Sequence, residues 1–270
     1  MNRNFKFVKC GENSCDIEKL LIKYKLKQIP VLNNNGVVVD IFTNENHTDD
    51  PSLPNPVVIM AGGKGTRLLP LTKDIPKPMV KVNGKPILEI VIDKIAKSGI
   101  KNIFLSVNHL KEQIMDYFGD GSDKGVKIQY LIEDQPLGTA GSLRLLPNSI
   151  NTPILVINAD ILTSLDPSQL LRFHSDQNSE ATMCVRQEKI YVPFGVVETQ
   201  GMDLVSFEEK PTYFKLVNAG IYVINPRLIS LIPINKYIDM PTFLELVQKE
   251  SHAVKICPMH EYWIDIGRPE

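Results

Sequence analysis

The chain has 270 residues, a formal net charge of -1 and 43% hydrophobic residues. This length suits one large domain, or one domain with an appendage, and the composition can bury a full core. The balanced charge argues against nucleic acid as a partner, and no apolar run is long enough to span a membrane. Because the first residues lack the apolar core of an export signal, we expect a cytoplasmic protein.

The first 46 residues predict a small α+β unit. Residues 16–27 ("DIEKLLIKYKLK") have apolar residues at helical spacing, and residues 29–33 and 37–43 read as strands joined by a turn at Asn35-Gly36. This helix and hairpin resemble the second half of a CBS domain, a regulatory fold that often binds adenine nucleotides. The first half of that repeat is missing, so the segment is a partial CBS-like unit. Residues 47–55 are polar and proline-rich and predict a linker.

From residue 56 to residue 270, strand and helix patterns alternate. Short apolar runs at 56–60, 102–107, 127–132 and 153–158 predict buried parallel strands, and residues 86–99, 110–118 and 139–146 have helical patterns. This order predicts an α/β fold with a doubly wound, mostly parallel, Rossmann-like sheet. Ligands of such sheets bind beyond the carboxyl ends of the strands.

A glycine-rich loop follows the first of these strands, in "VVIMAGGKGTRLLPLTKDIPKPM" at residues 57–79. It is not a Walker loop, because Arg67 stands where that motif needs glycine. It also lacks the third small residue of a dinucleotide fingerprint, since Leu68 stands there. Glycines let backbone N–H groups approach an anion, Arg67 adds a permanent charge, and Lys77 is held between two prolines.

Residues 63–79 resemble the signature of the sugar-1-phosphate nucleotidyltransferases, G-x-G-T-R-L-x-P-x-T followed by P-K-P-M. The resemblance extends over residues 56–270. Residues 133–143, "EDQPLGTAGSL", are similar to the family's base-binding loop, in which 137–141 open a helix with its N-terminus toward the nucleotide. The resemblance implies that the nucleotide contacts Ala61, Gly62, Gly63, Gly65, Thr66, Glu133, Pro136, Gly138 and Thr139.

Two aspartates match the positions at which the family holds Mg²⁺. Asp160 ends an apolar strand, where a carboxylate is costly unless it binds something, and Asp265 lies near the chain end. The resemblance further implies that relatives continue into a helix where this chain stops at Glu270.

Three further segments, 194–198, 207–211 and 218–223, resemble the family's sugar-side elements. The resemblance implies sugar contacts from Gly195, Glu209 and Asn218, and a contact from Lys210 to the phosphate of the sugar 1-phosphate. None of the five histidines falls in a motif. We also expect the four cysteines, Cys10, Cys15, Cys184 and Cys257, to be free thiols, because no second Cys/His pair completes a zinc set.

The implied reaction joins a sugar 1-phosphate to the α-phosphate of a nucleoside triphosphate and releases pyrophosphate. Catalysis would rest on positioning and charge stabilisation by Arg67, Lys77, Lys210 and a magnesium ion on Asp160 and Asp265. Glu133 in "EDQPLGTAG" favours the guanylyl branch, because a carboxylate accepts from the N1–H and amine of guanine. Uridylyl and thymidylyl transfer remain alternatives.

The CBS-like leader resembles bacterial nucleotidyltransferases that supply amino sugars for legionaminic-acid-type surface glycans, which makes glucosamine 1-phosphate the favoured acceptor. A different class of protein stays open, a nucleotide-sugar sensor that binds without turnover. Such proteins typically lose the motif arginine or a metal aspartate, and this chain keeps both. Family precedent and the unpaired CBS-like half predict a homo-oligomer.

Overall fold

The computed structural model describes residues 6–9, 17, 20–21, 23–24, 26, 28–33, 36–43, 53–63 and 65–267. The chain divides into two compact units, Met1–Pro51 and Ser52–Glu270. Cys10, Cys15, Asn35 and residues 47–52 of the predicted linker lie outside the described residues. No described helix is long and apolar enough to cross a bilayer.

The first unit contains a three-stranded sheet in the order β1-β2-β3, with β1 at Val8–Lys9, β2 at Gln28–Leu32 and β3 at Val38–Thr43. β2 and β3 are antiparallel, as the predicted hairpin requires, and Gly36 at φ 75° donates its N–H to the Asn33 carbonyl at 3.0 Å. Ile17 and Leu21 are helical and pack with Val8 and Ile29 in a small core. The relation of this unit to CBS domains stays a prediction.

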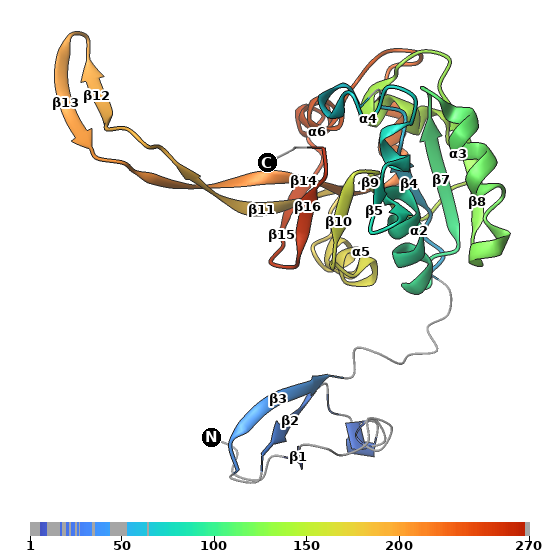
Figure 1. Cartoon of the computed structure of the whole chain (residues 1–270), viewed down its shortest axis with the longest axis horizontal. Coiled ribbons are helices and arrows are strands. Elements are labelled where there is room, and N and C mark those ends of the chain that lie inside the picture. The colour runs from blue at the N-terminus through green and yellow to red at the C-terminus, as the bar shows by residue number, and fades with distance from the viewer. Residues whose placement is uncertain are drawn as a thin grey trace. The chain divides into compact units, whose positions relative to one another are not determined.

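The second unit is built on a seven-stranded sheet in the order β15-β11-β14-β9-β4-β7-β8 (Figure 1). All neighbouring pairs are parallel except the two that involve β14. Within this unit the chain enters the sheet at β4, continues outward to β7 and β8, and then returns to place β9 on the other side of β4. This order confirms the doubly wound, mostly parallel sheet. The strands are β4 (Val57–Met60), β7 (Asn102–Val107), β8 (Lys127–Ile132), β9 (Ile154–Asn158), β11 (Ala181–Tyr191), β14 (Thr212–Ile224) and β15 (Val254–Pro258).

Helices cover both faces of this sheet. One core joins Val57 and Ile59 to α2 (Ile87–Lys97), α3 (Lys111–Phe118) and α5 (Pro167–Asp176), and the other joins Val58 to α6 (Met240–Lys249). Because β4 is buried on both faces, its apolar residues run without alternation. The short pairs are β5 (Lys81–Val82) with β6 (Lys85–Pro86), β10 (Ile161–Thr163) with β16 (Trp263–Asp265), and β12 (Val196–Gln200) with β13 (Asp203–Glu208).

The helix predicted at residues 139–146 is much shorter in the structure. Only one turn is α-helical, α4 at Gly138–Gly141, and the chain continues as 3₁₀ turn η4 at Ser142–Leu145. The N–H groups of Ala140 and Gly141 both donate to the Ile238 carbonyl, at 3.0 and 3.1 Å. These two donors are therefore used within the protein, while Gly138 and Thr139 line the cavity described below, and the nucleotide contact expected at this turn stays a prediction.

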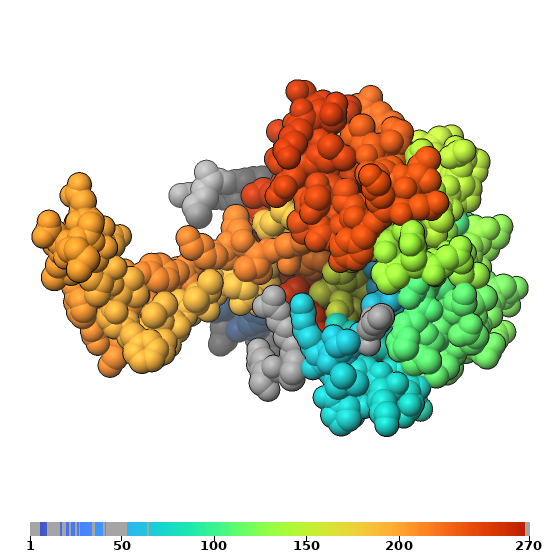
Figure 2. Space-filling model, turned by 90° about the horizontal axis from the view of Figure 1, so that it is seen from above, coloured from blue at the N-terminus to red at the C-terminus, as the bar shows by residue number. Residues whose placement is uncertain are grey.

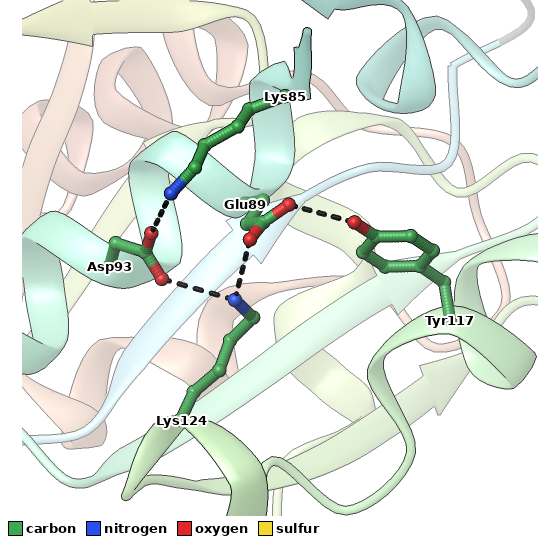
Figure 3. Close-up of polar contacts among 5 residues, drawn as sticks. All are labelled: Lys85, Glu89, Asp93, Tyr117 and Lys124. Carbon is green, nitrogen blue, oxygen red and sulfur yellow. Dashed lines mark hydrogen bonds and ion pairs between the residues drawn. The ribbon is translucent and has the colours of Figure 1, made fainter.

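A polar cluster fastens α2 to the segment that follows α3 (Figure 3). Lys124 lies between Glu89, at 2.9 Å, and Asp93, at 3.2 Å, while Tyr117 donates to Glu89 at 2.8 Å and Lys85 lies 3.5 Å from Asp93. The hydrogen bond from Lys124 lowers the pKa of Glu89. This contact therefore contributes stability above the usual glutamate pKa, and the contribution is lost as the pH falls below it.

His174 gives the stability of this unit a pH dependence. Its ring is buried, with Nδ1 2.8 Å from the Thr182 hydroxyl and Nε2 3.2 Å from Asn225 Oδ1, and burial lowers the pKa of His174 below 6.5. The unfolded chain then binds more protons just below neutral pH, so the free energy of unfolding falls as pH drops through about 6.5. We expect denaturant titrations between pH 7.5 and 5.5 to show a smaller fall for His174→Gln than for the wild type. An equal fall in both proteins would contradict this role.

Candidate active site

A cavity of about 540 Å³ lies at the carboxyl ends of β4, β7, β8 and β9. Its position is the crevice beside β4 where the winding of the sheet reverses, the usual place for a ligand in such folds. It brings together most of the nucleotide and catalytic residues expected from the sequence: Ala61, Gly62, Gly63, Gly65, Thr66, Arg67, Lys77, Glu133, Pro136, Gly138, Thr139 and Asp160.

Gly65 holds the glycine loop against the segment that carries Lys77. It has φ 63°, a Cβ there would lie 2.8 Å from the Lys77 Cβ, and its carbonyl accepts from the Thr72 hydroxyl at 2.8 Å. A 3₁₀ turn, η1 at Thr66–Leu68, begins directly after it and carries Arg67. Gly65 thus brings the two expected phosphate cations to one cavity.

We expect Gly65→Ala to lower kcat by at least about tenfold, because a side chain here pushes Lys77 out of position, and small misplacements cost large factors in rate. Gly125→Ala is the matched control: Gly125 has φ 66° but nothing within 4 Å of its Cβ position. Both variants carry the same backbone strain, so steady-state kinetics and thermal melting separate displacement from strain. Equal activities for the two variants would contradict the proposed contact.

Glu133 supports the cavity wall with both carboxylate oxygens. Oε1 accepts from the Ser106 hydroxyl at 2.5 Å, Oε2 accepts from the Leu137 N–H at 2.8 Å, and the side chain is buried. The Glu133 carbonyl accepts from Asn108 Nδ2 at 2.8 Å. Glu133 therefore fixes the loop that leads to α4, and a base would have to use the remaining acceptor positions of the carboxylate.

Asp160 and Asp265 converge through the pairing of β10 with β16. Ile161 lies opposite Asp265 in that ladder, and the Ile266 N–H donates to the Asp160 carbonyl at 3.1 Å. A Cβ on Gly267 would lie 2.8 Å from Asp265 Oδ1, 3.0 Å from Asp160 Oδ2, and against the Lys77 ammonium. The two carboxylates and the ammonium therefore meet at one point.

The donor set at this point fits a magnesium ion. Among the described residues, no group of three or more acidic, cysteine or histidine side chains is arranged around one point. Mg²⁺ commonly uses one or two carboxylates and completes its shell with waters and substrate phosphates. In the structure, Lys77 forms an ion pair with Asp160 and supplies the neutralising charge.

The expected sugar-side residues lie outside the cavity. These residues lie on an arm, residues 186–217, that projects away from the sheet (Figure 1). Gly195 directly precedes β12, and Glu209 and Lys210 directly follow β13. A Cβ on Gly195 would lie 3.1 Å from Glu209 Oε2, so these residues are close to one another. Lys210 has φ 48°, unusual for a side chain this long, and its ammonium lies 3.8 Å from Glu209 in an exposed pair.

Asn218 lies at the base of this arm, in β14. Its Nδ2 donates to the Tyr222 hydroxyl at 2.6 Å, and its Oδ1 accepts from the Gly220 N–H at 3.0 Å. Burial raises the pKa of Tyr222 to about 12. The Asn218 amide is therefore held by its own strand, and its role toward a sugar stays a prediction.

Four polar residues of the cavity were missed at the sequence level: Ser106, Asn108, Asn158 and Tyr237. The first three lie at the carboxyl ends of β7 and β9, so the rule that pointed to Asp160 also applies to them. Asn158 Oδ1 is buried without a hydrogen-bond partner among the described residues, which makes its side chain available to a ligand. Tyr237 carries no such signal, because it reaches the cavity from the loop before α6.

A second cavity, of about 250 Å³, is lined almost entirely by aliphatic side chains between α2, β10 and α5. The charged residue of its wall is Lys94, which donates to the Thr163 carbonyl and whose pKa is lowered by burial. Such a wall does not suit a triphosphate, so the polar cavity at the strand ends is the candidate active site.

Comparison with known proteins identifies the family. The family model described as "Nucleotidyl transferase" matches residues 56–270. This chain belongs to the nucleotidyl transferase family. The match covers the glycine loop, the acidic pair and the arm, and it leaves out the first unit.

Named relatives of this nucleotidyl transferase include two guanylyltransferases. It is 36% identical over 217 residues to the D-glycero-alpha-D-manno-heptose 1-phosphate guanylyltransferase of Campylobacter jejuni, covering 79% of this chain and 95% of that protein. It is 36% identical over 222 residues to the mannose-1-phosphate guanyltransferase of Yarrowia lipolytica, covering 79% of this chain and 61% of that protein. The chain thus spans about three fifths of the length of that second relative.

A solved structure shares the fold of the nucleotidyl transferase unit. HddC from Yersinia pseudotuberculosis, in complex with GMP-PN, matches with a TM-score of 0.63 and 28% identity, covering 80% of this chain and 95% of that one. A putative glucose-1-phosphate thymidylyltransferase from Bacillus anthracis, 24% identical with a TM-score of 0.63, covers 78% of this chain and 89% of its own and shows the same fold.

Proposed function

We propose that this chain transfers the guanylyl group of GTP to the phosphate of a sugar 1-phosphate, giving a GDP-sugar and pyrophosphate. The observation that carries the proposal is the cavity that joins the glycine loop, Arg67, Lys77 and Asp160, with the Asp265 carboxylate converging on Asp160 and Lys77. The choice of GTP is supported by the guanylyltransferase names of the relatives and by the guanine nucleotide analogue named with HddC.

The chemistry needs charge stabilisation more than a base. An oxygen of the sugar phosphate attacks the α-phosphorus of GTP, the bond to the bridging oxygen breaks, and its electron pair leaves with pyrophosphate. The attacking phosphate is already an anion near neutral pH, so no side chain has to remove a proton. Arg67 neutralises the departing pyrophosphate, and Lys77 neutralises the α-phosphate.

Asp160 and Asp265 would hold a magnesium ion, which supplies Lewis-acid charge and a template for the phosphates when bound. The Lys77 ammonium, paired with Asp160 in the structure, lies next to the same point. Lys77 therefore needs only to exchange Asp160 for a phosphate oxygen to reach its catalytic position. Glu133 would read guanine through its remaining acceptor positions.

The acceptor sugar has two lines of support. The relatives are named for mannose 1-phosphate and a heptose 1-phosphate. The first unit resembles the leader of enzymes that activate glucosamine 1-phosphate for bacterial surface glycans of the legionaminic-acid type. We therefore put glucosamine 1-phosphate first in the panel, followed by the mannose and heptose 1-phosphates.

The test measures pyrophosphate release from GTP, UTP, dTTP and CTP with Mg²⁺, each against these sugar 1-phosphates. We expect release with GTP and one sugar. Release only with UTP or dTTP would move the chain to the uridylyl or thymidylyl branch. Tight GTP binding in calorimetry with no release from any pair would favour a binding-only protein and overturn the proposed reaction.

A further inference from the structure

The arm, residues 186–217, is a two-stranded ribbon that leaves the sheet alone. Up to Val185, β11 has a neighbour on each side, β15 and β14. From Arg186 opposite Val217 to Tyr191 opposite Thr212 it pairs with β14 only, and β12 and β13 continue the ribbon. Six such pairs extend the stem by about 20 Å. Figures 1 and 2 show this ribbon standing away from the body of the unit.

The arm exposes more apolar surface than a two-stranded ribbon can leave in water. Ten large apolar side chains of the arm are exposed, among them Phe194 at 72%, Met202 at 100%, Leu204 at 67% and Phe207 at 61%. At about 100 Å² each they present roughly 1,000 Å² summed over both faces of the ribbon, against about 800 Å² per partner in a standard interface. An isolated two-stranded ribbon is marginally stable at best, so this surface calls for a partner.

The base of the arm is held in its outward direction. Trp263 donates its indole N–H to the Ala219 carbonyl at 2.8 Å, and the Arg186 guanidinium lies 5.7 Å from the Trp263 ring centre. The register of β11 against β14 shifts only between Met183 and Val185, inside the body. Folding the arm back over its own cavity would therefore bend or break a continuous ladder, whereas a second copy can meet it without bending.

The arm also carries a cation, Lys210, that could neutralise the phosphate of the sugar 1-phosphate. No residue of the arm, all of which is described, lines the cavity, and among the described residues that line it the cations are Arg67 and Lys77, both assigned to the nucleotide. Lys210 and Glu209 lie at the junction of the stem with β12 and β13. The described lining of the cavity therefore holds no further cation for the sugar phosphate unless an arm reaches it.

We propose that two copies of this chain exchange arms, so that the arm of each copy covers the cavity of the other and places its Lys210 on the phosphate of the sugar 1-phosphate. The proposal rests on the proposed function for the role of Lys210, and on the apolar arm for the exchange itself. A two-fold arrangement makes both contacts identical and closes the assembly, and exchange of identical elements is a low-cost route to a dimer.

The first test is the mass of the full chain in sedimentation, which does not depend on activity. We expect twice the chain mass of 30.4 kDa for the wild type. The double variant Leu204→Asp, Val205→Asp should be monomeric, because neighbouring residues of β13 point to opposite faces and one of them must lie in the interface. Ile132→Asp, an exposed change on β8 at the other edge of the sheet, should leave the mass unchanged. A monomeric wild type, or a dimer that survives the double change, overturns the exchange.

The second test is complementation between two inactive chains. Lys210→Ala loses the arm cation and Asp160→Asn loses the metal carboxylate, so each alone should have at most about 1% of wild-type turnover, the scale for losing one charge-stabilising group. Co-expressed with different tags and purified through both, a mixed dimer with exchanged arms has one intact site in two and recovers about half of the wild-type turnover. An arm that served its own cavity would recover none.

The outcomes separate the two proposals. An active wild type with an inactive mixed dimer overturns the exchange and leaves the proposed function standing, and so does full activity of Lys210→Ala alone. A wild type that is inactive with every substrate pair overturns the proposed function, and the exchange is then decided by sedimentation.

Discussion

Replacement of Arg67 by alanine should lower kcat by a factor of about 10²–10³, the usual scale for losing one group that stabilises developing charge. Arg67 lies exposed on the 3₁₀ turn that follows the glycine loop, and within residues 65–267 its side chain has no ion pair. Its charge is therefore available to the triphosphate, and its removal takes nothing from the packing of the fold. Steady-state pyrophosphate release and thermal melting measure the two effects separately.

Two variants control this result. Arg67→Lys keeps the charge but loses the planar fork, so we expect an intermediate kcat. Arg172→Ala removes an arginine from the exposed side of α5 and should leave kcat unchanged. An Arg67→Ala enzyme with kcat within about twofold of the wild type would contradict the assigned role.

Replacement of Asp160 by asparagine should lower kcat by a similar factor of about 10²–10³ and raise the Mg²⁺ concentration needed for half-maximal rate. The change leaves Asp265 as the sole carboxylate at the point where the two converge, and it also removes the partner of Lys77. A titration of pyrophosphate release with Mg²⁺ reports both effects, and chelation with EDTA should stop the wild-type reaction.

Asp176→Asn is the matched control, because it makes the same charge change at an exposed position at the end of α5. It should leave the Mg²⁺ titration unaltered. If Asp160→Asn has the Mg²⁺ dependence of the wild type, the acidic pair does not hold the metal, and its ion pair with Lys77 has a structural role only.

Much of the fold could be predicted because local pattern and burial agree. The strands expected at 102–107 and 127–132 occur with those bounds. The first is an almost continuous apolar run inside the sheet, and the second is an edge strand that buries Ile128 and Leu131. The change from α4 to the 3₁₀ turn η4 was not predicted, and neither was the partner of the first N–H groups of this turn, the Ile238 carbonyl about a hundred residues away along the chain. No local pattern reports that contact.

The sequence by itself determined the family, the doubly wound sheet and the residue types of the site. Glycines, fixed cations and carboxylates at the ends of strands indicate a site that binds phosphates and a metal ion. Only the tertiary structure decided how those residues are grouped. Asp160 and Asp265 come together through the pairing of β10 with β16. Both carboxylate oxygens of Glu133 accept hydrogen bonds that hold the loop before α4. The tertiary structure also carried Gly195, Glu209 and Lys210 away on an arm. The physical reason is that strand pairing and side-chain contacts between distant segments set these positions, and spacing along the chain does not record them.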